Sequence, residues 1–157
     1  MKSINYYILT LTFVSIFATT PYLPKGKNSP DYSSYSLPVL NKNEKLVLAI
    51  QKNNIEEKKK NFTFIRSVST ETAIIHLTTC KIYPVVARIK LGENLTIINH
   101  DSKNHTLETD KDHKIAIPKN SKITITADFG YGPGLYSWVC DGSNNPLSGM
   151  IIIESRN

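Results

Sequence analysis

From Asn61 to the end of the chain, hydrophobic and polar residues alternate in short runs rich in Ile, Val, Thr and Phe. Runs of this kind, separated by Gly, Pro, Asn and Asp, are typical of strands in a two-layer sandwich. They predict seven strands, a number that fits one Greek-key β-sandwich built from antiparallel sheets. The predicted strands are 72–77, 85–91, 94–99, 105–109, 122–127, 134–140 and 150–154.

The N-terminal segment has a different pattern. No charged residue lies between Lys2 and Lys25, and an apolar run extends from Ile8 to Ala18. A short basic start followed by such a run predicts a signal peptide or membrane anchor at 1–23. Polar residues dilute the run, so we favour cleavage over retention as an anchor. The chain is therefore expected to be exported, as a secreted or membrane-anchored extracytoplasmic protein.

Residues 24–66 are predicted to be a basic polar linker, and residues 67–157 the folded domain. The linker begins with a stretch rich in Pro, Ser, Tyr, Lys and Asn, which cannot bury enough apolar surface to form a core. Residues 43–60 are consistent with a short helix capped by Asn43, with Leu46, Ala49 and Ile50 on one side. The run 46–50 is also consistent with a strand.

The net charge of +6 is unevenly distributed. Residues 24–66 carry nine Lys or Arg and four Asp or Glu, whereas residues 67–157 carry nine of each. The excess positive charge thus belongs to the linker, and the domain itself is neutral. This distribution argues against nucleic acid as a partner, because a basic surface on the folded domain is what binds phosphate groups.

Three residues between positions 105 and 150 are candidate metal ligands. Cys140 ends a predicted strand, Met150 begins the last one, and His105 opens an earlier strand, so we expect all three at one end of the sandwich. Thiolate, thioether and imidazole groups are the ligands that a mononuclear copper site uses. The sequence therefore predicts one copper ion as cofactor.

The region from Cys80 to Glu154 resembles the cupredoxins, the blue copper proteins of the plastocyanin type. The resemblance rests on Tyr83-Pro84, the spacing from Gly92 to His105, the sequence GLYSWVC and the Gly149-Met150 ending. It implies a cupredoxin-like β-sandwich with one copper ion held by two histidines, a cysteine and an axial methionine. His105 would then be the first histidine, Cys140 the thiolate and Met150 the axial ligand.

The sequence departs from this pattern in the loop between Cys140 and Met150, which contains no histidine. In the layout that the resemblance implies, Cys80 lies at the copper end of the fold. A site of His105, Cys80, Cys140 and Met150 would be rich in sulfur and would favour Cu(I). Alternatively, Cys80 and Cys140 form a disulfide, as two cysteines in an exported protein often do. We favour a free Cys140 that binds copper.

These residues support a binding protein rather than an enzyme, because no nucleophile motif or paired-carboxylate spacing accompanies the histidines. We expect a single-electron carrier that docks transiently with a redox partner protein. The alternatives are a Cu(I) carrier or storage module, and a metal-free interaction domain held by a Cys80–Cys140 disulfide. His76, His100 and His113 are expected to be ordinary surface or turn residues.

Overall fold

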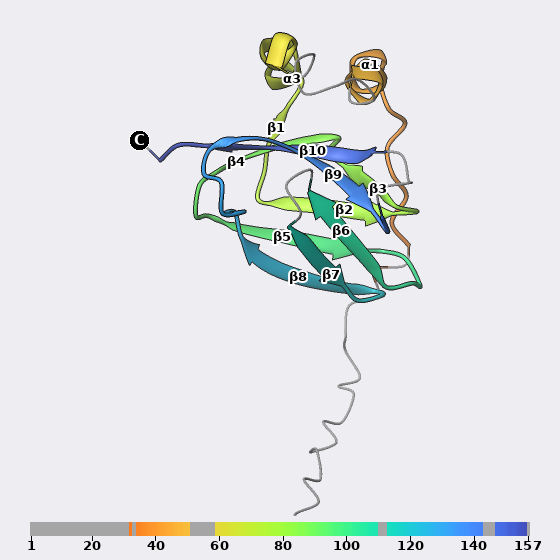
Figure 1. Cartoon of the computed structure of the whole chain (residues 1–157). Coiled ribbons are helices and arrows are strands. Elements are labelled where there is room, and N and C mark those ends of the chain that lie inside the picture. Colours follow the sequence, from red (N-terminus) through yellow and green to blue (C-terminus); the bar gives the residue numbers. More distant parts are fainter. Residues whose placement is uncertain (1–31, 33, 51–58, 110–112, 143–146, 157) are drawn as a thin grey trace, which may run out of the picture.

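The computed structural model describes residues 32, 34–50, 59–109, 113–142 and 147–156. These residues form ten strands in two sheets, together with two helices (Figure 1). The prediction of an all-β sandwich is confirmed. The predicted signal peptide or anchor at 1–23 lies outside the described residues, among which no helix has the length and apolar character needed to span a membrane.

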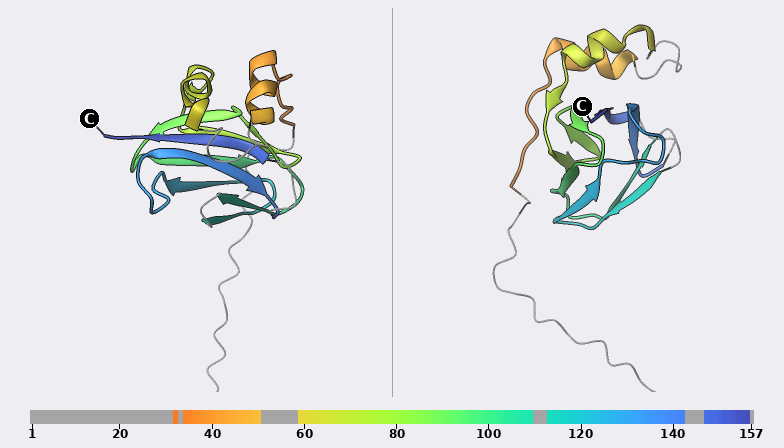
Figure 2. Two further views of the ribbon diagram at one scale, coloured as in Figure 1. Left: turned by 45° about the horizontal axis from the view of Figure 1, so that its top comes forward. Right: turned by 90° about the vertical axis from the view of Figure 1, so that its left-hand side faces the viewer.

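The two sheets pack face to face (Figure 2). The larger contains, in order, β1 (Thr70–Glu71), β4 (Val86–Lys90), β10 (Leu147–Glu154), β9 (Gly134–Cys140), β6 (His105–Thr109) and β7 (Lys114–Ile117). The smaller contains, in order, β3 (Lys81–Tyr83), β2 (Ile74–Thr78), β5 (Asn94–Asn99) and β8 (Ser121–Thr126). Strands β5, β6 and β9 have the predicted bounds, whereas β1, β3 and β7 were not predicted.

Both sheets are mixed, which corrects the expectation of purely antiparallel sheets. β2 pairs with β5 in parallel, and β4 pairs with both β1 and β10 in parallel. The chain leaves β2 through the β3 hairpin, crosses to β4 in the other sheet and then returns to β5, so β5 runs in the same direction as β2. β5 and β6 consequently belong to different sheets, and residues 100–104 connect the sheets at one end of the sandwich.

The main core fills the space between the sheets. It includes Leu77 and Ile97 from the smaller sheet and Leu107, Trp138 and Ile151 from the larger one, all at most 1% exposed. Strand alternation explains the set, because every second side chain of each strand points inward. Burial of these large side chains is the main stabilising contribution to such a sandwich.

Helix α1 (Lys42–Ile50) begins two residues earlier than a helix capped by Asn43 would. The amide of Glu44 donates to Oδ1 of Asn41 at 2.9 Å, and the amide of Asn41 donates to Oε2 of Glu44 at 2.8 Å. These reciprocal bonds form a capping box, so Asn41 is the cap. The buried residue of the helix is Val47, while Leu46 remains 49% exposed. The strand alternative for 46–50 is therefore wrong.

Helices α1 and α3 (Phe62–Ser67) cover the outer face of β4 and β10 (Figures 1 and 2). This part of the predicted linker thus packs on the domain, because a second apolar cluster joins the helices to the sheet. The side chains of β10 alternate between the two clusters, so this strand is buried on both faces. The buried members of the second cluster are Val47, Ile65, Val85, Val86, Met150 and Ile152.

Candidate metal centre

Cys80 lies in a tight turn between β2 and β3. Thr78 pairs with Lys81, and the two residues between them, Thr79 and Cys80, have φ values of 49° and 59°. Two positive φ values are characteristic of type I′ hairpin turns, which favour Asn and Gly, and they are strained for a β-branched residue. The Thr79 amide donates to Oδ2 of Asp101 at 2.7 Å. This bond ties the turn to the segment that follows β5.

Cys140 and His105 come from adjacent strands of the larger sheet. β6 begins at His105, β9 ends at Cys140, and the two strands are antiparallel, with Leu107 opposite Cys140. The pairing places the first residue of β6 and the last residue of β9 at the same end of the sandwich. Cys140 is 0% exposed and His105 is 6% exposed.

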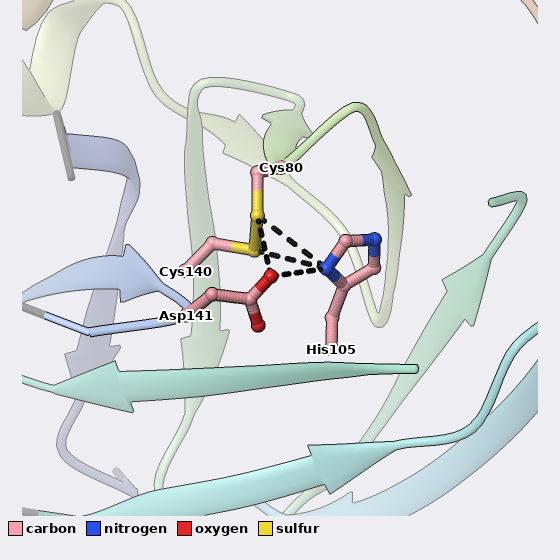
Figure 3. Close-up of side chains that lie close together, drawn as sticks. All are labelled: Cys80, His105, Cys140 and Asp141. Carbon is pink, nitrogen blue, oxygen red and sulfur yellow. Dashed lines mark hydrogen bonds and ion pairs between the residues drawn. A yellow bond between two sulfur atoms is a disulfide. The ribbon is translucent and has the colours of Figure 1, made fainter. Parts of the chain in front are cut away.

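Cys80 and Cys140 form a disulfide, which joins the turn of the smaller sheet to the end of β9 in the larger one (Figure 3). Of the two arrangements that the sequence leaves open, the structure has this one, and the prediction of a free Cys140 is wrong. The folded backbone accounts for the bond, because the two Cα atoms lie 5.5 Å apart. Disulfides need a separation of about 4.4–6.8 Å.

One ring nitrogen of His105 faces both sulfur atoms. Its Nδ1 lies 3.4 Å from Sγ of Cys80 and 3.5 Å from Sγ of Cys140. Oδ2 of Asp141 lies 2.8 Å from the same nitrogen and 3.4 Å from Sγ of Cys80. The four donor atoms are all within 4.8 Å of one another. Three predicted ligands, Cys80, His105 and Cys140, thus meet. Asp141 joins them, although nothing in the sequence marks it as a ligand beyond its position next to Cys140.

His105 lies between two carboxylates. Its Nε2 is 2.8 Å from Oδ2 of Asp101, while Nδ1 faces Asp141. Only the doubly protonated ring donates hydrogen bonds to both. In the tautomer with its proton on Nε2, the ring donates to Asp101, and the Nδ1 lone pair, which lies near Asp141 and both sulfur atoms, can bind a metal ion. A carboxylate behind a histidine commonly fixes the tautomer that binds a metal ion in this way.

Asp141 is held in its charged form. Burial alone would raise the pKa of this carboxyl group, but the Thr106 amide, 2.9 Å from Oδ1, and the His105 ring outweigh that effect. The pKa of Asp141 is therefore below its usual range, so the group carries a negative charge beside His105 near neutral pH.

The structure does not bring Met150 to this group. Met150 is 2% exposed and packs in the second apolar cluster with Val47 and Ile65, on the face of β10 turned away from the main core that contains Cys140. Packing alone accounts for a glycine at position 149, because a Cβ atom there would lie 3.0 Å from the carbonyl oxygen of Val85. The Gly149-Met150 pair thus serves packing in this fold.

A second group of rings gathers around His76 and His100, beside the turn. Nδ1 of His76 lies 2.9 Å from Nε2 of His100, and the Tyr35 ring stacks on both imidazoles with centroid distances of 4.2 and 4.3 Å. Nδ1 of His100 contacts the carbonyl oxygen of Tyr32. His100, at 8% exposed, is therefore not the ordinary surface residue expected from the sequence, whereas His113 is exposed.

Acid pH is expected to weaken this ring group. Burial, and then the proximity of His100, lower the pKa of His76 below its ordinary value of 6.5. The unfolded chain then binds more protons than the folded one below pH 6.5, so the stabilising contribution is complete above that pH and is lost as the pH falls through the folded pKa. We expect melting temperatures of wild type to decline as the pH falls below 6.5, and less steeply for His76→Gln.

His113→Gln is the matched control, because His113 is exposed and should leave the pH dependence unchanged. Equal slopes for wild type and His76→Gln would contradict the assignment.

A cavity of about 1240 Å³ lies beside the disulfide. Cys80, His105 and Asp141 line it together with residues 35–40, from the segment that precedes α1. The candidate site therefore borders a cavity that this segment also lines.

Comparisons with solved structures find similarity at low identity. The chain is similar to a copper-containing nitrite reductase from Thermus scotoductus SA-01 (16% identity, TM-score 0.44, 59% of this chain and 29% of that one). It is also similar to a mutant amicyanin in the reduced Cu(I) form (17%, 0.41, 57% and 89%) and to a purple cupredoxin from Nitrosopumilus maritimus (16%, 0.40, 53% and 100%). The sequence matches no protein-family model and no curated protein. The two face-to-face sheets make the domain a β-sandwich.

Proposed function

We propose that this protein is an exported cupredoxin-like protein that binds copper(I) after the Cys80–Cys140 disulfide is reduced. The observation that carries the proposal is the convergence of both sulfur atoms on Nδ1 of His105, within 3.5 Å. Export is inferred from the apolar segment at 1–23.

The donor atoms suit copper only when the Cys80–Cys140 disulfide is reduced. With the disulfide intact, only the imidazole of His105 and the carboxylate of Asp141 are available, and this pair does not make a copper site. Reduction yields two thiols, and two thiolates with one imidazole are the soft donors that favour Cu(I). Cys80, Cys140 and His105 would hold the ion, and Asp101 would keep Nε2 of His105 protonated.

The same set argues for a Cu(I) carrier over a single-electron carrier. A blue copper site must hold both Cu(I) and Cu(II), for which the family uses a second histidine and an axial methionine. The loop after Cys140 offers no second histidine, and Met150 packs beneath the helices. Bound copper would supply a soft monovalent ion for transfer to a partner, which we expect to dock at the end of the sandwich where Cys80 lies.

Anaerobic competition with a chromogenic Cu(I) chelator tests this proposal. We expect the reduced protein to take one copper(I) from the chelator and the oxidised protein to take none. Met150→Leu is a matched control and should bind as wild type does, because Met150 lies outside the group. Failure of the reduced protein to compete, or binding of zinc(II) but not copper(I), would refute the proposal.

A further inference from the structure

The two sulfur atoms of the disulfide differ in accessibility. Cys80 is half-buried and lines the cavity, whereas Cys140 is 0% exposed and is not among the cavity residues. A nucleophile that enters the cavity therefore meets Sγ of Cys80 first. Thiol–disulfide exchange depends on which sulfur is attacked and on access to it.

The cavity walls suit an extended chain that carries a thiolate. Leu37, Pro38 and Leu40 provide apolar surface. The charged lining residues are Lys45, Lys81, Lys103, Asp101 and Asp141, so positive side chains outnumber carboxylates by one. Positive side chains raise the local concentration of an anionic nucleophile. The apolar surface can contact the residues that flank a partner's thiol.

The position of Cys80 also has a conformational cost. Thr79 and Cys80 both adopt the left-handed region, and the Thr79 amide is held by Asp101. Strained backbone of this kind persists where the surroundings enforce it, and it is concentrated at functional sites. Here it presents one sulfur of the pair to the cavity while Cys140 stays inside the sandwich.

We propose that the Cys80–Cys140 pair undergoes thiol–disulfide exchange with a dithiol partner protein, with Cys80 as the attacked residue. A partner thiolate forms a bond to Sγ of Cys80, the Cys80–Cys140 bond breaks, and Cys140 leaves as a thiolate that takes up a proton. The partner's second thiol then attacks the partner's first sulfur atom, which is bonded to Cys80 in the mixed disulfide. Cys80 is released as a thiol. The partner dithiol is oxidised to a disulfide, and the pair gains two electrons and two protons.

This inference rests on the proposed function, because the exchange produces the dithiol that copper(I) would bind. It is tested without any metal, so that its failure is distinguishable from a failure of copper binding.

Two single-cysteine variants compare the sulfur atoms directly. Cys140→Ser leaves Cys80, Cys80→Ser leaves Cys140, and both lose the same cross-link, so each is the matched control for the other. With glutathione disulfide as the probe, we expect Cys140→Ser to form the mixed disulfide at least about tenfold faster. Equal rates, or faster reaction of Cys80→Ser, would overturn the proposal.

The wild-type protein provides a second test that does not depend on the folding of a variant. The oxidised chain is treated with reduced glutathione, quenched with an alkylating reagent and mapped by mass spectrometry. We expect glutathione on Cys80 and the alkyl group on Cys140. Glutathione on Cys140, or opening of the disulfide only in denaturant, would also overturn the proposal.

Discussion

Replacing Cys80 and Cys140 together with alanine is expected to lower the free energy of unfolding by about 4 kcal/mol. The disulfide joins residues 60 positions apart, and a cross-link removes more loop-closure entropy from the unfolded chain the longer the loop that it closes. It also connects the two sheets at one end, where the turn at Cys80 meets the end of β9.

Urea denaturation followed by Trp138 fluorescence measures this effect, because Trp138 is buried in the main core. Wild-type protein reduced with a phosphine is the control, since it keeps both side chains but loses the cross-link. Similar midpoints for the variant and the reduced wild type would assign the loss to the cross-link. A variant as stable as the oxidised wild type would show that the disulfide contributes little.

Three strand predictions agree with the structure to the residue, and they share a physical basis. Residues 94–99, 105–109 and 134–140 each combine alternating or aromatic-rich sequence with a clear boundary, such as the Gly92 turn, which has a φ of 74°. Strand β3 is only three residues long, and β7 four. Runs that short carry too little periodicity to be recognised from one sequence.

The order and direction of the strands in the sheets are harder to predict from the sequence than their positions along the chain. Alternation identifies which side chains share a face, but it does not say which strand lies beside which, so it does not predict the parallel pairing of β2 with β5. The apolar run from Met150 to Ile153 did contain a signal. Continuous apolar strands are buried on both faces, which here reflects the helices packed over β10.

That two-sided burial also explains the outcome for the candidate site. His105 and Cys140 meet because β6 and β9 are neighbours, and Cys80 joins them through a hairpin turn whose residues are unusual for positive φ. Met150 is excluded because Ile151 and Ile153 take the face of β10 that points into the sandwich. A sequence offers the ligand types, whereas the face on which each one lies is decided by the packing of whole sheets.

Asp101→Ala is expected to weaken copper(I) binding by the reduced protein by about 10- to 100-fold. Oδ2 of Asp101 accepts from Nε2 of His105 at 2.8 Å and from the Thr79 amide at 2.7 Å. The alanine variant would therefore free both the imidazole and the turn that holds Cys80, so that two donors lose their fixed positions. The affinity is measured by the same chelator competition, with melting temperatures recorded for each variant.

Two substitutions separate positioning from a general loss of stability. Asp101→Asn keeps a carbonyl oxygen that can accept both bonds, so its affinity should fall less than that of the alanine variant. Asp128→Ala removes another carboxylate that accepts a hydrogen bond from a backbone amide, that of Gly130. Asp128 follows the end of β8 that lies away from the site. It should leave copper affinity unchanged even where it lowers the melting temperature. Equal affinity losses for Asp101→Ala and Asp128→Ala would mean that Asp101 supports only the fold, because an acceptor that positions His105 and Cys80 acts on these two donors alone.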